Sequence, residues 1–296
     1  MKYLTLKKYC WILTAVILLI GFVLMQINFV DYGYAFFILF PLFLGFAIGT
    51  LFKNGFQILY LTIGIVVGSL ALLMFGIEGF VCVLMLLPIF IFSVWLGYFI
   101  SKRLKMKVDS DTQKVMVSVL PLIVLLGAGH LEKMIDLEPQ KIEIVSSKLL
   151  DYTPEIVFDE VKAMEKLDAE KSLLMKLGLP TPIRCELKAD TVGALRHCIF
   201  ENGAIIAQLT KYEKGKILEM NVVDYTLTGR HWFKFIDANY TFEESEGKTK
   251  ITRTSSYTSI LKPRWYWEPL EKYGIEKEHE FVLSSLKKNI KEKYDR

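Results

Sequence analysis

The fold of the C-terminal half is decided by residues 196–223, which read RHCIFENGAIIAQLTKYEKGKILEMNVV. Asn202-Gly203 and Lys214-Gly215 are two-residue turn signals, and the flanking residues alternate between apolar and polar. Successive side chains of a strand point to opposite faces, so this alternation predicts antiparallel strands with one buried face. The residues expected on that face are Phe200, Cys198, Ile205, Ala207, Leu209, Leu218, Met220 and Val222.

The turns also predict a register. With the first turn at Asn202-Gly203, the expected pairs are Phe200 with Ile205, Cys198 with Ala207 and Arg196 with Leu209, followed by Leu209 with Met220 and Ala207 with Val222. A further turn at Glu246-Gly247 pairs Phe242 with Ile251, Tyr240 with Arg253, Ala238 with Ser255 and Ile236 with Tyr257.

This register directs two arginines, Arg196 and Arg253, to the apolar face. A charge in an apolar interior must be paired or hydrogen-bonded. Either both arginines lie at the sheet ends, where they extend towards solvent or pair with helix carboxylates, or they contact the carboxylate or phosphate of a mostly apolar ligand. A wrong register is the third alternative. For the second interpretation, the predicted ligand-binding residues are Arg196, Arg253, Tyr240, Tyr257, Ser255, His279, Leu209 and Met220.

Helices flank these strands. Residues 141–149 are strand-like, Pro154 opens a helix, a short helix covers about 169–178, and a final helix covers about 274–294. The last helix has an inward stripe that includes His279. This histidine is interpreted either as a core residue or as a catalytic base, and no second titratable group stands at a diagnostic spacing from it.

The order of these elements resembles a known family. With GLPTPIRCEL (178–187), VGALRHCIFENG (192–203) and GKTKITRTSSYTSILKPRWYWEP (247–269), residues 141–296 are similar to the SRPBCC superfamily, in particular its polyketide cyclase/dehydrase and START-like lipid-transport members. The resemblance implies an α+β helix-grip fold, in which an antiparallel sheet wraps around the C-terminal helix and encloses an apolar cavity. It also implies a lipid or another hydrophobic small molecule as ligand, while only some members are enzymes.

The N-terminal half has a different composition. Five apolar segments, at about 10–30, 34–52, 56–76, 79–100 and 115–130, are long enough to be candidate transmembrane helices. The predicted organisation is an all-α membrane domain at 1–130, a linker at 131–140 and the START-like domain at 141–296. Gly45 with Gly49 and Gly64 with Gly68 are expected to pack helices together, within the chain or between copies in a homo-oligomer.

The charges predict an orientation. All nine Lys and Arg residues up to position 130 fall before the first segment or in the second and fourth loops, which places the N-terminus in the cytoplasm of a bacterial-type cell and the C-terminal domain outside. If the fifth segment only lies at the interface, that domain is cytoplasmic instead. From 131 onward, 27 basic and 28 acidic residues balance, which argues against nucleic-acid binding.

Two further features bear on this domain. Cys185 is expected to face Cys198 across a hairpin, where the pair either forms a disulfide or stays reduced. Trp265, Tyr266 and Trp267, in a predicted loop from Lys262, are interpreted either as a membrane contact beside the cavity mouth or as core residues below the last helix.

The leading functional prediction is a membrane-anchored domain that binds a hydrophobic ligand, a lipid by preference, at the membrane surface. One alternative is a cyclase or aromatase, in which Arg196, Arg253, Tyr257 or His279 polarises a polyketide carbonyl; the other is a ligand-responsive sensor or assembly module that acts through the glycine pairs. No metal-ligand spacing, cofactor motif or catalytic residue is predicted from the sequence.

Overall fold

The computed structural model describes residues 16–17, 19–21, 23–24, 31–52, 55–74, 79–104, 108, 110–135, 138–227 and 232–295. The predicted first span, at about 10–30, lies largely outside these residues. The chain forms two compact units: the first comprises 1–77, 82–138 and 260–266, and the second comprises 78–81, 139–259 and 267–296.

The second unit is built on a seven-stranded antiparallel sheet with the order β1-β7-β6-β5-β4-β3-β2. The connection from β1 to β2 joins the two edges of the sheet, and every later connection joins neighbouring strands. The strands are β1 (Ile142–Leu150), β2 (Pro182–Leu187), β3 (Leu195–Phe200), β4 (Gly203–Glu213), β5 (Ile217–Tyr225), β6 (Phe233–Ser245) and β7 (Lys248–Ser259).

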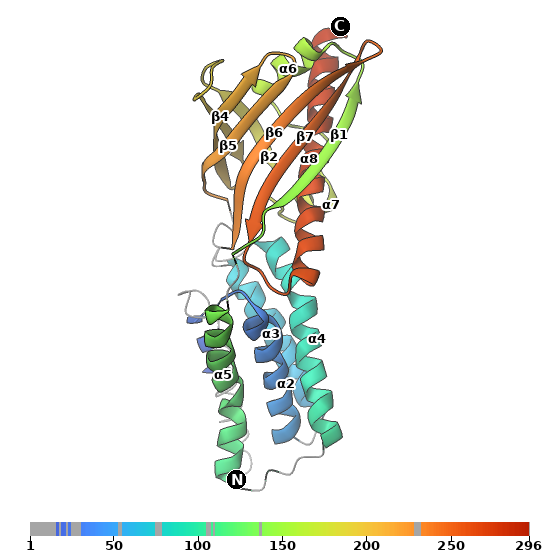
Figure 1. The fold of residues 1–296 in the computed structure, drawn as a ribbon. Helices are drawn as coiled ribbons and strands as arrows, with labels where there is room; N and C mark the ends of the chain where they lie inside the picture. Colours follow the sequence, from blue (N-terminus) through green and yellow to red (C-terminus); the bar gives the residue numbers. More distant parts are fainter. Residues whose placement is uncertain are drawn as a thin grey trace. The chain divides into compact units, whose positions relative to one another are not determined.

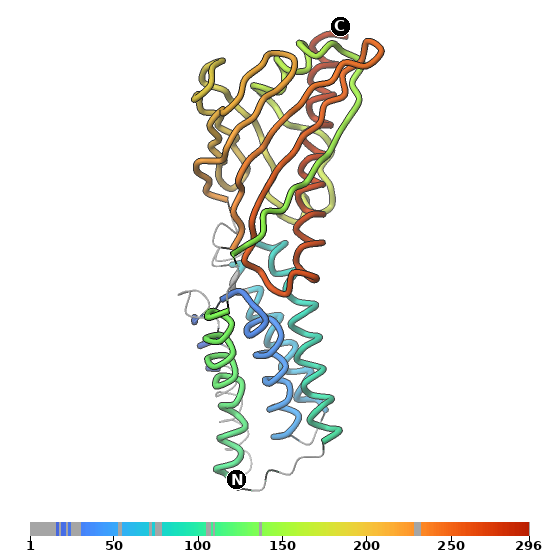
Figure 2. Tube along the Cα trace, in the orientation of Figure 1, coloured from blue at the N-terminus to red at the C-terminus, as the bar shows by residue number. Residues whose placement is uncertain are grey.

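Helices cover one face of this sheet. The long C-terminal helix α8 (Arg264–Tyr294) runs along the curled inner face (Figure 1). The helix α6 (Pro154–Lys162) lies near the C-terminal end of α8, and the short α7 (Leu173–Lys176) lies beside a more N-terminal part of it. The tube in Figure 2 shows the strands from β4 to β7 bending around the same helix. A curled antiparallel sheet that holds a long C-terminal helix is the helix-grip arrangement, so this part of the fold prediction is confirmed.

The structure bears out the face assignment and corrects the register of one hairpin. Cys198 faces Ile205 and Phe200 faces Gly203, which shifts the β3–β4 pairing by two residues from the prediction because Glu201 and Asn202 form the turn. A shift of two residues leaves every side chain on the same face. The predicted pairs of β4 with β5 and of Tyr240 with Arg253 are confirmed.

A second correction concerns β6. Phe235, instead of Ile236, faces Tyr257, because the register shifts between Phe235 and Asp237. Such an irregularity inserts an extra residue and re-aims the side chains that follow it. Asp237 therefore faces Ser256, a neighbour of the inward-facing Ser255, and lies on the outer face of the sheet.

The last helix is longer than the sequence predicted. It begins at Arg264 rather than near residue 274, so most of the predicted aromatic loop forms its first turns. Pro263 and Pro269 favoured a loop at this position, yet Pro269 is accommodated inside the helix. The peptide bond between Lys262 and Pro263 is cis.

The first unit is helical. A π-helical turn, η1 (Ala35–Leu39), leads into α2 (Phe40–Leu51), followed by α3 (Phe56–Met74), α4 (Phe80–Leu104) and α5 (Asp111–Met134). Among the described helices, α4 and α5 are long and apolar enough to cross a membrane, and the apolar helices Ala35–Leu51 and Phe56–Leu70 are shorter. The predicted fifth segment is thus part of a continuous 24-residue helix that begins with a capping box of Ser110 and Gln113.

The two glycine pairs of this unit differ in their surroundings. A Cβ added to Gly45 would lie 1.8 Å from the carbonyl oxygen of Val94, and one added to Gly49 would lie 1.9 Å from Oγ of Ser101, so both glycines pack against α4. A Cβ added to Gly64 or Gly68 would meet no atom of the described residues within 4 Å. The first pair therefore serves packing within the chain, and the second lies at an open surface of α3.

Candidate ligand-binding site

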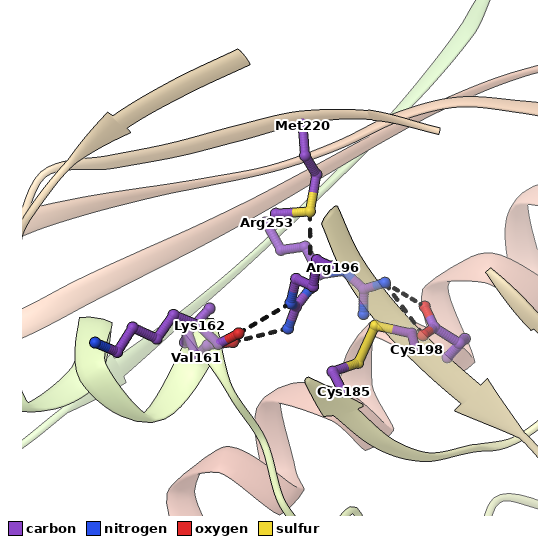
Figure 3. The surroundings of a disulfide bond; sticks show 8 residues. Val161, Lys162, Cys185, Arg196, Cys198, Met220 and Arg253 are labelled. Carbon is purple, nitrogen blue, oxygen red and sulfur yellow. Dashed lines mark hydrogen bonds and ion pairs between the residues drawn. A yellow bond between two sulfur atoms is a disulfide. The ribbon is translucent and has the colours of Figure 1, made fainter. Parts of the chain in front are cut away.

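Arg196 lies inside the second unit and holds the end of a helix. Its side chain points from β3 to the C-terminus of α6, where Nη2 donates to the carbonyl oxygen of Val161 (2.7 Å) and Nε to that of Lys162 (3.2 Å), as Figure 3 shows. The last carbonyl groups of a helix have no partner within it and carry partial negative charge. Only 3% of Arg196 is exposed, so this arginine caps α6 from the interior.

Arg253 comes from β7 and is paired differently. Its Nη2 atom donates to both carboxylate oxygens of Glu278 on α8, at 3.1 and 2.9 Å. Exposure is 10% for the arginine side chain and 16% for the glutamate side chain, so the pair is largely removed from water. Neither arginine lies at an exposed sheet end, and the expected partnership with a helix carboxylate is found for Arg253.

The two guanidinium groups share one aromatic ring. The central carbons of Arg196 and Arg253 lie 5.8 and 5.7 Å from the centroid of Tyr240, a distance at which a cation and a ring attract each other. Burial lowers the pKa of Arg196, and the positive charge of Arg253 lowers it further. Burial also acts on Arg253, but the carboxylate of Glu278 outweighs it and raises the pKa of Arg253. Both arginines remain charged at neutral pH.

His279 bridges α8 to two strands. Its Nδ1 lies 3.0 Å from Oγ of Ser146 on β1, and its Nε2 lies 2.9 Å from Oγ of Ser255 on β7. Burial, assisted by the positive charge of Arg253, lowers the pKa of His279 to about 2. The imidazole is therefore neutral at physiological pH and far from the pKa that suits a general base. This geometry supports the interpretation of His279 as a core residue.

Two clusters of apolar side chains form the core of this unit. One cluster includes Phe158, Leu218 and Leu286, and a smaller one consists of Ile144, Tyr257 and Ile275 with neighbouring aromatic rings. Three inner-face residues of the central strands are only partly buried: Ile205, Val222 and Ala238. Since Val222 faces Ala207, and Ala207 faces Arg196, accessible apolar surface adjoins the arginines.

The predicted cysteine pair lies beside Arg196. Cys185 on β2 and Cys198 on β3 are direct cross-strand partners with Cα atoms 4.0 Å apart, and the structure has a disulfide between them (Figure 3). Cys185 is buried in the larger apolar cluster, whereas Cys198 is partly exposed. The bridge ties the edge strand β2 to the strand that carries Arg196.

The structure brings together some of the other predicted ligand-binding residues. Met220 lies beside Arg196, with Sδ 3.8 Å from Nη1, and Leu209 faces Met220 across β4 and β5. Tyr257 belongs to the smaller apolar cluster instead, where its hydroxyl group donates to Glu271 of α8.

The aromatic residues at the start of α8 separate from one another. Trp265 is 69% exposed, whereas Trp267 is buried. Within the first unit, the hydroxyl group of Tyr266 donates to the carbonyl oxygen of Met85. Of the three predicted membrane-contact residues, Trp265 alone presents most of its side chain to the surroundings.

Comparisons with known proteins were made for the whole chain. No protein-family model matches this sequence, and no curated protein matches it. Similar solved structures include a protein of unknown function from Staphylococcus aureus (12% identity, 54% of this chain and 100% of that chain, TM-score 0.37), a START superfamily protein from Mycobacterium smegmatis (9%, 51% and 97%, 0.36) and a protein from Nitrosomonas europaea (12%, 55% and 100%, 0.36). These identities are too low to transfer a ligand or an activity, so the chemistry of the site rests on its own residues.

Proposed function

We propose that the second unit binds an amphipathic, largely apolar small molecule, such as a lipid, between the sheet and α8. The observation that carries this proposal is the position of Arg253. Its side chain is only 10% exposed, and two of its nitrogen atoms have no hydrogen-bond partner in the described part of the chain. Partly buried Val222 and Ala238 offer apolar surface nearby.

A ligand of this kind would resolve an energetic problem of the unit. A buried polar donor without a partner costs about 1–3 kcal/mol, and more when it is charged. An apolar tail gains about 25 cal/mol for each Å² of surface that it buries. A molecule with both an acceptor group and an apolar tail gains from both effects at this site.

The proposal predicts that the protein retains such a molecule through purification. Full-length protein extracted in a mild detergent and subjected to organic extraction should release an amphipathic compound in near-stoichiometric amount, detectable by mass spectrometry. The matched control is the Val222→Arg variant, which places a bulky cation on the inner face and should release several-fold less. Equal, substoichiometric recovery of bulk lipid from both proteins would contradict the proposal.

We also propose that the helices of the first unit anchor this domain in a membrane, with the domain outside the cytoplasm. The lengths of α4 and α5 support the anchor. The orientation is supported by the basic residues up to position 130, which all fall on one side of the predicted spans. Short basic loops are retained in the cytoplasm. The disulfide between Cys185 and Cys198 adds support, because such bonds persist in oxidising compartments and are rare in the cytosol.

The orientation predicts the state of these cysteines in cells. When free thiols of bacteria that express the protein are blocked with N-ethylmaleimide, and disulfides are then reduced and tagged with a polyethylene-glycol maleimide, two tags per chain are expected. The double variant C185S/C198S should take up none. Untagged wild-type protein, together with fluorescence of a cytoplasm-only reporter fused after residue 296, would place the domain in the cytoplasm.

A further inference from the structure

The two buried arginines are not equivalent, although the sequence placed both on the same face. Arg196 directs two of its nitrogen atoms at carbonyl oxygens of α6 and the third at the sulfur of Met220. Arg253 uses only Nη2, and its Nε and Nη1 have no hydrogen-bond partner within the described ranges. Arg196 therefore serves the fold, and Arg253 has donor capacity left for another molecule.

The charges around Arg253 define what that molecule can be. Arg196 and Arg253 each contribute one positive charge, Glu278 contributes one negative charge, and His279 is neutral. Together these four side chains carry one excess positive charge, in buried surroundings where charges are poorly screened. A singly charged anion neutralises this excess charge, and a neutral group leaves it uncompensated. A dianion changes the net charge from positive to negative.

We propose that Arg253 binds the singly charged oxyacid head of the ligand, with Glu278 as the residue that positions its guanidinium group. This inference rests on the proposed function and specifies its ligand class. An acceptor oxygen on Nε or Nη1 forms a charge-assisted hydrogen bond, which is about twice as strong as a neutral one. Two chemical sources supply such a head on an apolar tail: a long-chain carboxylate and the phosphodiester of an anionic phospholipid.

Glu278 and Arg196 confine the head to one place. Glu278 occupies Nη2 of Arg253 with both of its oxygens, which leaves Nε and Nη1 as the donors for a ligand. Arg196 lies against the same Tyr240 ring and adds positive charge, while its own nitrogen atoms already contact Val161, Lys162 and Met220. We therefore expect recognition of the head to depend on Arg253 far more than on any other arginine.

The test measures binding of matched ligands to the full-length protein in an uncharged detergent by native mass spectrometry. The ligands are hexadecanoic acid, its methyl ester, hexadecyl phosphate at pH 8 and a phosphatidylglycerol. The acid or the phosphatidylglycerol should bind at least about tenfold more tightly than the ester, in keeping with a charged hydrogen bond in a desolvated site. Preference between these two identifies the source of the head.

Variants separate the role of Arg253 from general effects on folding. The double variant R253Q/E278Q removes both charges together and should bind acid and ester equally. R184Q removes an exposed arginine of β2, which pairs with Glu186, and should keep the wild-type preference. If the wild type binds acid and ester equally, the head-group inference is overturned while apolar binding stands. If it binds none of the four ligands, the proposed function itself fails.

Discussion

Replacement of Glu278 by alanine is expected to lower the free energy of unfolding of the second unit by about 3–5 kcal/mol. The reason is the position of Arg253, whose side chain is 10% exposed and whose hydrogen bonds within the described residues go to this carboxylate. Without Glu278 the guanidinium group stays buried beside a second positive charge, that of Arg196, with the Tyr240 ring as its remaining attraction. Removal of one member of a buried pair costs more than the pair contributes.

The double variant R253M/E278L gives the matched comparison. Two apolar side chains of similar size replace the pair without leaving a buried charge, and such replacements are often neutral or stabilising. We expect its unfolding free energy to lie within about 1 kcal/mol of the wild type. Thermal unfolding of the full-length protein in detergent, followed by tryptophan fluorescence, compares the three proteins under one condition. Equal midpoints for E278A and the wild type would show that Arg253 does not depend on Glu278.

The comparison also bears on function. If the double variant is as stable as the wild type, the ion pair contributes little to folding. A buried pair of that kind, with donors left over on Arg253, fits a ligand site better than a structural one. The variant R253M/E278L would then keep the stability of the wild type and lose the charged contact with the ligand. One variant would thus distinguish the effect on stability from the effect on binding.

The sheet is the part of the fold that could be predicted best from the sequence. Alternation of side chains placed Arg196 and Arg253 on the inner face, because period two is a property of the strand itself. The β3–β4 register was wrong by two residues, since both Asn202-Gly203 and Glu201-Asn202 can form a tight turn there. The faces were still correct, and the predicted pairing of Cys185 with Cys198 agrees with the structure.

The partners of the arginines could not be predicted in the same way. Glu278 lies on a helix, beside His279 in the inward stripe, and its contact with Arg253 depends on how α8 packs across the sheet. Arg196 bonds to backbone carbonyls at the end of α6, and side-chain types carry no signal for that contact. A helix C-terminus leaves carbonyl groups without partners in the helix, but the sequence does not show which side chain reaches them.

Replacement of Gly45 by alanine is expected to destabilise the first unit by about 2–3 kcal/mol. The added Cβ would lie 1.8 Å from the carbonyl oxygen of Val94, and from the other side a Cβ on Gly97 would lie 1.8 Å from that of Leu42. These are backbone atoms, so no side-chain rotation relieves the overlap, and α2 and α4 must move apart. Close backbone approach through glycine is a main source of helix association in membranes.

Gly64→Ala provides the control, because it makes the same chemical change in an equivalent small-residue pair. In the part of the chain that the structure describes, no atom lies within 4 Å of the Cβ that it adds, and alanine favours a helix by about 1 kcal/mol over glycine. Circular dichroism at increasing temperature should therefore show a lower midpoint for G45A and an unchanged or higher one for G64A. If the midpoint of G64A fell as well, the open face of α3 would have to pack against another helix, and a contact between copies of the chain would explain it.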